Sequence, residues 1–268
     1  MFATNQFVYV HLPKTGGTFV ETALQRLYGR QTLNTIANKV ARKLRLNVTV
    51  ELPKHGTVRD IPQTLRRLTV LANMRNPFDR YVSMYKYQRY QKHPEQFGAD
   101  NHVIMNRWPQ FPNLSFEQYV HYMNDASAFL RLPGFASDDQ PGLQTQQFLY
   151  FFTRNIEQCA RNLTPESASN GRLIMMMPEN IHFIFTNNLN QDLYNFLLSI
   201  GQPSHRIKFI LDMRRVLPDG GGRNDSDHWE HYYTPELKDY VQRKERLLLE
   251  LFPQFQLIQP ATILKNAA

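Results

Sequence analysis

Short apolar runs alternate with segments of helical periodicity along most of the chain. Runs rich in β-branched and aromatic residues predict strands, and apolar residues at three- and four-residue steps predict helices. Four runs fit the first description: Phe7–Val10, Thr69–Met74, Leu173–Met177 and His182–Thr186. Strands that alternate with helices predict an α/β fold, in which a central, mainly parallel sheet is flanked by helices.

Helix-start signals follow the first two strands. Thr18 is expected to cap a helix, and Asn76 with Pro77 at the first helical position opens another that runs to about Tyr90. Further helices are predicted over about Ser115–Asn124, over Leu189–Ile200, and from Thr234 to near Leu251.

The pattern weakens between residues 93 and 146, where prolines and aromatic residues are frequent. We expect one domain spanning residues 1–268, with this stretch as an insertion over the sheet. The glycine run Pro218–Gly222 predicts a flexible loop.

Basic residues are concentrated in one segment. The 268-residue chain has a formal net charge of +8, and Arg26–Arg67 holds ten basic residues against two acidic ones, which accounts for all of it. A local basic surface attracts anions, although a solvated helix face explains the same pattern. Nucleic acid is disfavoured as a partner, because zinc-ligand spacing, RNP-like aromatics and a basic zipper are all missing.

Composition also bears on the compartment. Hydrophobic residues make up 42% of the chain, which is enough for one substantial core. Cys159 is the single cysteine, so no internal disulfide can form. No apolar run approaches the roughly 20 residues that cross a bilayer. These features predict a soluble cytoplasmic protein, with a luminal domain trimmed of its anchor as the alternative.

The first chemical motif is Pro13-Lys-Thr-Gly-Gly-Thr18, between a strand and a helix. Glycines let backbone N–H groups approach a ligand, and a helix N-terminus favours anions. Lys14 adds a charge and two threonines add hydroxyl groups, so we expect a phosphate cradle made of Lys14, Thr15, Gly16, Gly17 and Thr18. The loop is not a Walker A motif, because its lysine precedes the glycines. An ordinary strand-to-helix turn is the alternative.

The second motif is Arg75-Asn-Pro-Phe-Asp-Arg-Tyr-Val-Ser83. Arg75 ends a predicted strand, and Ser83 lies about two turns into the following helix. A guanidinium and a hydroxyl that converge in this way can bind a second phosphate. A buried arginine that satisfies a carbonyl group, beside a neutral helical serine, would leave the same pattern.

Together the two motifs resemble those of the sulfotransferases that use 3′-phosphoadenosine 5′-phosphosulfate (PAPS), and most closely the carbohydrate-modifying branch. Pro13–Thr18 is similar to that family's 5′-phosphosulfate loop, and Arg75 with Ser83 to its 3′-phosphate pair. The resemblance implies a P-loop-like three-layer sandwich and the transfer of a sulfuryl group to a hydroxyl or amine acceptor. It also implies that Lys14 contacts the bridging oxygen of PAPS and that no metal is required.

Several further roles are expected from this resemblance. A general base must take the proton of the acceptor, and His55 is the first candidate, because relatives place a catalytic histidine there. His11 is the second, and Glu21 and Glu51 remain open. Arg223, beside the glycine run, is expected to close over the nucleotide.

The nature of the acceptor is less determined. A saccharide or glycoconjugate acceptor, including an anionic one, fits the basic segment, and the aromatic stretch between residues 93 and 146 fits an acceptor pocket. Tyr85, Tyr87 and Tyr90 are expected to form core or groove wall. An ATP-dependent kinase of related fold and a non-enzymatic module that binds anionic glycans are the competing hypotheses.

Overall fold

The computed structural model describes residues 1–29, 50–51, 53–98, 101–126, 130, 132–165, 172–214, 216 and 228–256. Its centre is a sheet with the strand order β3-β1-β2-β4-β5. The strands are β1 (Phe2–Ala3), β2 (Phe7–Val10), β3 (Val50–Glu51), β4 (Thr69–Met74) and β5 (Ile181–Phe185).

The three strands that matter most for the site run parallel to one another. Phe7 pairs with Thr69, and Val70 pairs with Ile181, in continuous parallel registers. β1 is antiparallel to both of its neighbours. The prediction of a mainly parallel sheet is therefore confirmed.

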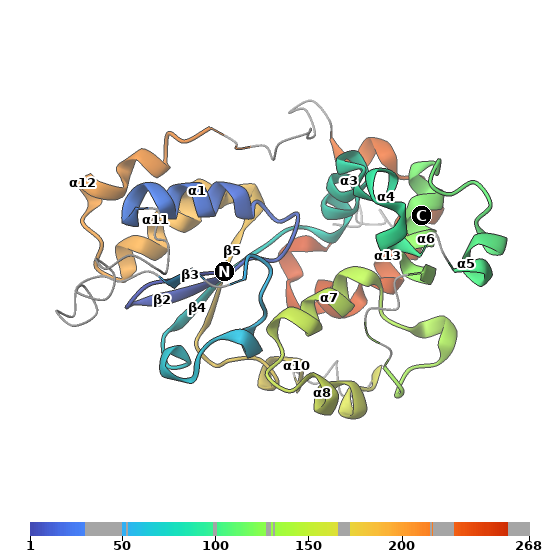
Figure 1. Cartoon of the computed structure of the whole chain (residues 1–268), viewed down its shortest axis with the longest axis horizontal. Coiled ribbons are helices and arrows are strands. Elements are labelled where there is room, and N and C mark those ends of the chain that lie inside the picture. The colour runs from blue at the N-terminus through green and yellow to red at the C-terminus, as the bar shows by residue number, and fades with distance from the viewer. Residues whose placement is uncertain are drawn as a thin grey trace, which may run out of the picture.

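Side chains alternate between the two faces of this sheet, as the strand period requires. Phe7, Tyr9 and Leu71 pack against α1 (Gly17–Tyr28) and α11 (Leu189–Ser199). Figure 1 shows these two helices together on one side of the sheet.

The intervening residues of the strands face the opposite way, into the larger core. Val8, Val10 and Ala72 share this core with residues of α7 (Leu143–Phe152) and α14 (Arg246–Leu251). The layers are thus helix, sheet and helix, which confirms the predicted architecture.

α3 (Pro77–Tyr87) leaves the carboxyl end of β4 and leads away from the sheet. The predicted cap is confirmed, because the Asn76 side chain accepts a hydrogen bond from the backbone N–H of Phe78 and Pro77 opens the helix. Gln88 then adopts a left-handed conformation with φ 55°. The single helix predicted to reach Tyr90 is accordingly divided into α3 and α4 (Arg89–Lys92).

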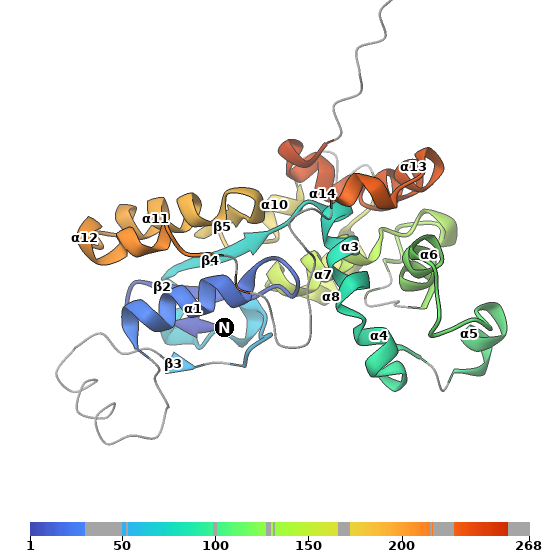
Figure 2. The ribbon, with the colours of Figure 1, turned by 90° about the horizontal axis from the view of Figure 1, so that it is seen from above.

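Between residues 93 and 146, the helix α6 (Phe116–Ala126) packs against α3, beyond the carboxyl ends of the parallel strands, and not over the sheet (Figures 1 and 2). The rings of Tyr85 and Phe116 lie 5.4 Å apart, and the Tyr81 hydroxyl donates to Asn124 Oδ1 at 3.1 Å. The remaining helices are α5 (His102–Arg107), α8 (Ile156–Asn162), α10 (Arg172–Met175), α12 (Ser204–Ile207) and α13 (Pro235–Lys244).

Three further local predictions were wrong. Leu173–Met177 was predicted as a strand, but α10 covers Arg172–Met175, and Ile174 and Met175 are solvent-exposed. A short apolar run has no period that separates strand from helix, and here no neighbouring strand pairs with it in the described part of the chain.

The other two concern helix boundaries. Gly16, in a left-handed conformation, occupies the N-cap of α1, and Thr18 does not cap it. The predicted C-terminal helix is two helices, α13 and α14, with the buried Glu245 between them.

Candidate active site

The loop between β2 and α1 has a conformation that its sequence makes possible. Lys14 and Gly16 have φ angles of 65° and 91°, in the left-handed region that favours glycine. A Cβ atom on Gly16 would lie 2.7 Å from Leu189 Cδ2, and one on Gly17 would lie 2.0 Å from His11 Nε2. Close packing therefore requires both glycines, and the left-handed backbone conformation is a second requirement at Gly16.

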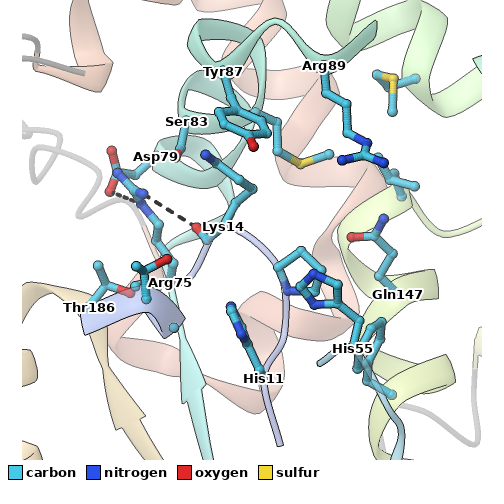
Figure 3. Close-up of a pocket in the computed structure, with 18 of the residues that line it drawn as sticks. His11, Lys14, His55, Arg75, Asp79, Ser83, Tyr87, Arg89, Gln147 and Thr186 are labelled. Carbon is cyan, nitrogen blue, oxygen red and sulfur yellow. Dashed lines mark hydrogen bonds and ion pairs between the residues drawn. The ribbon is translucent and has the colours of Figure 1, made fainter. Parts of the chain in front are cut away.

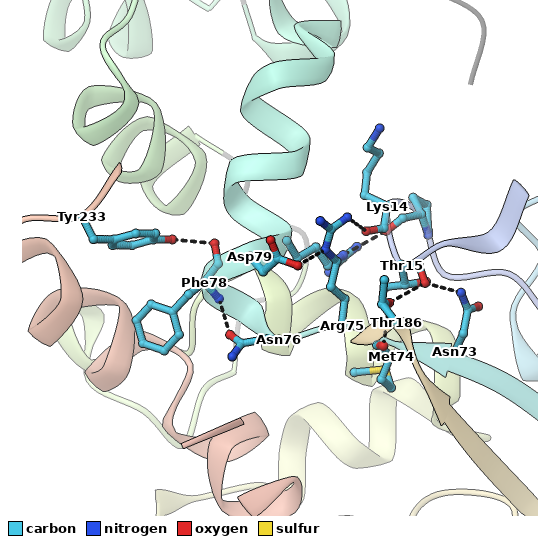
Figure 4. A network of polar contacts seen from close by, with 12 residues as sticks. Lys14, Thr15, Asn73, Met74, Arg75, Asn76, Phe78, Asp79, Thr186 and Tyr233 are labelled. Carbon is cyan, nitrogen blue, oxygen red and sulfur yellow. Dashed lines mark hydrogen bonds and ion pairs between the residues drawn. The ribbon is translucent and has the colours of Figure 1, made fainter. Parts of the chain in front are cut away.

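Polar contacts from two neighbouring strands hold this loop from below (Figure 4). The carbonyl oxygen of Thr15 accepts hydrogen bonds from the Asn73 amide and, at 2.7 Å, from the Thr186 hydroxyl. Asn73 in turn accepts a hydrogen bond of 2.6 Å from the Tyr9 hydroxyl. The ends of β2, β4 and β5 thus fix the loop together.

Thr15 differs from the other predicted phosphate-binding residues. Its side chain is fully buried, and its hydroxyl donates to the carbonyl of Leu12 at 2.7 Å. The structure places it beneath the loop and not on the cavity wall, so it can offer a ligand only backbone groups.

The second motif reaches the same loop. Arg75 Nε donates to Asp79 Oδ2 at 2.6 Å, and its Nη1 lies 3.4 Å from the carbonyl oxygen of Lys14. Arg75 is only 7% exposed and Ser83 only 9%. The predicted pair is therefore held in a fixed, largely desolvated position beside the first motif.

A cavity of about 1000 Å³ lies over these elements (Figure 3). It brings together residues from His11 to Val216, including both motifs. The predicted residues on its wall are Lys14, Gly16, Gly17, Thr18, His55, Arg75 and Ser83.

Two histidines and a glutamate stand at one side of the cavity. The rings of His11 and His55 lie 4.9 Å apart in an edge-to-face arrangement, and His11 Nδ1 lies 2.9 Å from Glu21 Oε1. Both histidines line the cavity, but His11 is buried whereas His55 is exposed. The structure therefore brings the first two base candidates together, with Glu21 behind His11.

These contacts shift two pKa values. Partial desolvation, followed by the positive charges of His11 and Lys54, lowers the pKa of His55 against an opposing hydrogen bond to the His11 backbone. Burial by itself would raise the pKa of Glu21, but the hydrogen bond and charge of His11 outweigh it and lower that pKa. The lowered pKa favours the unprotonated imidazole of His55, which is the form that can accept a proton.

Lys14 points across the cavity. Its ammonium nitrogen lies 3.7 Å from the centroid of the Tyr87 ring, close enough for a cation–π interaction. Tyr87 lies one helical turn after Ser83 on α3 and lines the cavity, as does Tyr90. The expectation that these tyrosines form core or groove wall is met by both and by Tyr85, which packs inside the aromatic cluster with Phe116 and Tyr119.

The sequence did not predict which residues form the opposite end of the cavity. Its wall comes from α4, α6, α7 and the turn around Phe97, and the only signal for it was the frequency of aromatics and prolines between residues 93 and 146. The residues involved include Arg89, Gln96, Phe97, Tyr119, Met123, Gln147, Tyr150 and Phe151.

Some predicted features lie outside the described residues. These are Arg223, the Pro218–Gly222 loop, half of the Arg26–Arg67 segment, and the side chain of Glu51. Among the residues that are described, no group of three or more His, Cys, Asp or Glu side chains could hold a metal ion. Within that same part of the chain, no helix has the length and apolar character of a membrane span.

Comparison with known proteins identifies a family for the chain. Residues 1–159 match the model of the sulfotransferase family, a range that contains both motifs. No curated protein matches the chain significantly. Among solved structures, the chain is similar to mouse sulfotransferase SULT7A1 complexed with PAP, with a TM-score of 0.42 and 15% identity over 96% of this chain and 86% of that one. Because the family model covers more than half of the sequence, the chain belongs to the sulfotransferase family, as the two motifs predicted.

Proposed function

We propose that this enzyme transfers a sulfuryl group from PAPS to a hydroxyl group of a saccharide, with an amine as the alternative acceptor group. One observation carries the proposal: the lysine–glycine loop and the Arg75–Ser83 pair, far apart in sequence, converge on a single cavity. Their residue types suit the two phosphorylated ends of one nucleotide.

The donor end of the reaction is assigned to the loop. As the sulfuryl group leaves, negative charge develops on the 5′-phosphate of the departing nucleotide. Lys14 and the backbone N–H groups of Gly17 and Thr18 at the start of α1 are available to stabilise that charge. Arg75 and Ser83 would bind the 3′-phosphate, and Arg223 remains a proposed nucleotide contact.

We assign to His55 the removal of the proton from the acceptor. Its lowered pKa favours the unprotonated ring, and its position on the cavity wall gives an acceptor access to that ring. His11 is the second candidate for the base, with Glu21 accepting a hydrogen bond from its Nδ1.

A saccharide acceptor is supported by the composition of the far wall. Tyrosine and phenylalanine rings alternate there with the amide groups of Gln96 and Gln147 and the guanidinium of Arg89. Asp79 is the only acidic residue among the described residues that line the cavity, and it pairs with Arg75. This charge balance favours a neutral or anionic sugar over a cationic acceptor.

Other parts of the proposal follow from the sequence. The stretch between residues 93 and 146 would be the acceptor-side insertion of a single domain. A metal-independent reaction is proposed from the chemistry of sulfuryl transfer, and a cytoplasmic location from the lone thiol of Cys159. Nucleic acid is not expected to be a partner.

Two measurements test the proposal. Titration calorimetry without magnesium should show binding of 3′-phosphoadenosine 5′-phosphate (PAP), and radiolabelled PAPS should label a member of a panel of sugars, glycolipids and phenols. Magnesium-dependent ATP turnover without PAP binding would instead indicate a kinase. Glycan binding that survives both Lys14→Ala and Arg75→Ala, in a chain that transfers no sulfate, would indicate a binding module.

A further inference from the structure

The guanidinium of Arg80 connects the two ends of the cavity from underneath. This side chain is 2% exposed and lies on α3. Its Nε donates to the carbonyl oxygen of Pro13 at 2.9 Å. Pro13 is the first residue of the Pro13–Thr18 loop, which we call the phosphate loop. Its Nη2 donates to Gln147 Oε1 at 2.6 Å, and its Nη1 donates to Gln144 Oε1, both on α7.

These contacts fix which way the Gln147 amide faces. A guanidinium has only donors, so the amide atom that meets Arg80 must be the oxygen, and the NH₂ group must point elsewhere. Gln147 lines the cavity, and in Figure 3 its nitrogen lies on the side toward Arg89. Arg89 orders a second amide in the same way, since its Nη2 donates to Gln96 Oε1 at 2.7 Å. The far wall therefore presents N–H donors, which suit the oxygen atoms of an acceptor.

Arg80 keeps its charge in this buried place. Burial lowers its pKa to about 10, while the nearby Glu245 carboxylate acts in the opposite direction. Glu245 is itself fully buried, and it accepts hydrogen bonds from the Tyr81 hydroxyl at 2.6 Å and from the Thr145 backbone at 2.8 Å. A buried charge is tolerated only where hydrogen bonds satisfy it. The Arg80 guanidinium is therefore held in place by its contacts with Pro13, Gln144 and Gln147.

We propose that Arg80 is a positioning residue that sets the phosphate loop and the acceptor-side amide of Gln147 at the same time. Pro13 directly precedes Lys14, so the anchored carbonyl of Pro13 limits where the Lys14 ammonium can lie. Gln147 is then the residue through which Arg80 affects the acceptor. This inference rests on the proposed sulfotransferase reaction and assigns Arg80 no contact with the reacting atoms.

Titration calorimetry with PAP tests the donor half. In Arg80→Lys the positive charge remains, but one ammonium cannot span the three acceptors. Loss of a charge-assisted hydrogen bond to the loop predicts that the Kd for PAP rises about tenfold or more. Arg246→Lys, at an exposed site paired with Glu250, is the matched control and should bind PAP as the wild type does.

Gln147→Leu separates the effect of Arg80 on the nucleotide from its effect on the acceptor. It leaves the Pro13 contact in place, so the Kd for PAP should change by less than about twofold. With the acceptor that turns over fastest in the transfer screen, its KM should rise about tenfold while kcat is largely kept. A purely structural role for Arg80 would instead lower the melting temperature of Arg80→Lys without changing its Kd for PAP, and that result would overturn the inference.

If Arg80→Lys does not fold, the double variant Arg80→Met with Glu245→Gln removes both buried charges together, and Glu245→Gln alone is its control. The inference is supported if the double variant binds PAP more weakly than Glu245→Gln does. It is overturned if these two variants bind PAP equally well. Failure of the wild type to bind PAP would contradict the proposed function itself. Wild-type binding that Arg80→Lys retains would contradict only the role of Arg80.

Discussion

The ammonium group of Lys14 lies 3.7 Å from the centre of the Tyr87 ring. This contact spans the cavity between the phosphate loop and α3, one turn beyond Ser83. It holds the charged end of the lysine at the boundary between the proposed nucleotide side and the proposed acceptor side. An interaction of this type contributes about 0.5–2 kcal/mol, depending on how far it is desolvated.

Tyr87 should therefore affect transfer through Lys14. Tyr87→Leu removes the aromatic face, and we expect kcat to fall roughly 3- to 30-fold as the ammonium loses its position. Tyr87→Phe keeps the ring face and is the matched control, which should stay close to wild-type kcat. Equal losses in both variants would mean that the hydroxyl, and not the cation–π contact, matters.

Replacement of Lys14 tests the chemical step itself. Lys14→Met keeps much of the aliphatic stem but removes the charge that we propose faces the leaving phosphate. We expect kcat to fall by about 10²–10³, the usual cost of losing one electrostatic contact to the transition state. Circular dichroism checks that the variant is folded, and near-normal turnover in a folded variant would refute this role for Lys14.

Gly17 should be intolerant of any side chain. A Cβ atom there would overlap the His11 ring, 2.0 Å from Nε2, so Gly17→Ala forces the imidazole or the start of α1 to move. We expect a loss of about 1–3 kcal/mol in the free energy of unfolding, measured by urea denaturation. Adding His11→Ala should remove the overlap, so the double variant should lose less stability than the sum of the two single variants. Strict additivity would show that the ring is not the obstacle.

The pH dependence of transfer should report the general base. His55 acts as a base only when unprotonated, and its pKa is lowered from 6.5. Activity should therefore rise with pH along a limb centred below pH 6.5 and stay level through neutrality. His55→Ala should abolish this limb and reduce kcat by about 10²–10⁴. A limb that persists in His55→Ala but disappears in His11→Ala would assign the base to His11.

Most of the part of the molecule that carries the two motifs could be predicted from the sequence. The order of residues in Pro13–Thr18 and in Arg75–Ser83 specified a loop, a strand end and a helix face, because glycine, proline and capping residues act locally. β2, β4 and β5 were likewise visible as apolar runs. Prediction failed for α10, where a short apolar run carries no period, and for the two-residue strands β1 and β3, which are too short to leave a pattern.

The far wall of the cavity lay beyond such reasoning, since it depends on contacts between segments distant in sequence. Nothing local indicates that Gln147 would meet Arg80, 67 positions earlier, or that Glu245 would meet the start of α7, about 100 positions earlier. The contacts of these polar groups follow from their burial, which requires each of them to find a hydrogen-bond partner.

The sequence by itself therefore determined the family of this protein and the two motifs proposed to bind the donor, because phosphate-binding motifs are short patterns of backbone shape and charge. Only the tertiary structure decided which residues share one cavity: that Lys14 lies over Tyr87, that His11 and His55 stand together, and that Thr15 lies beneath the loop. The physical reason is that side-chain orientation and desolvation are properties of packed, long-range contacts, which no local pattern of residues encodes.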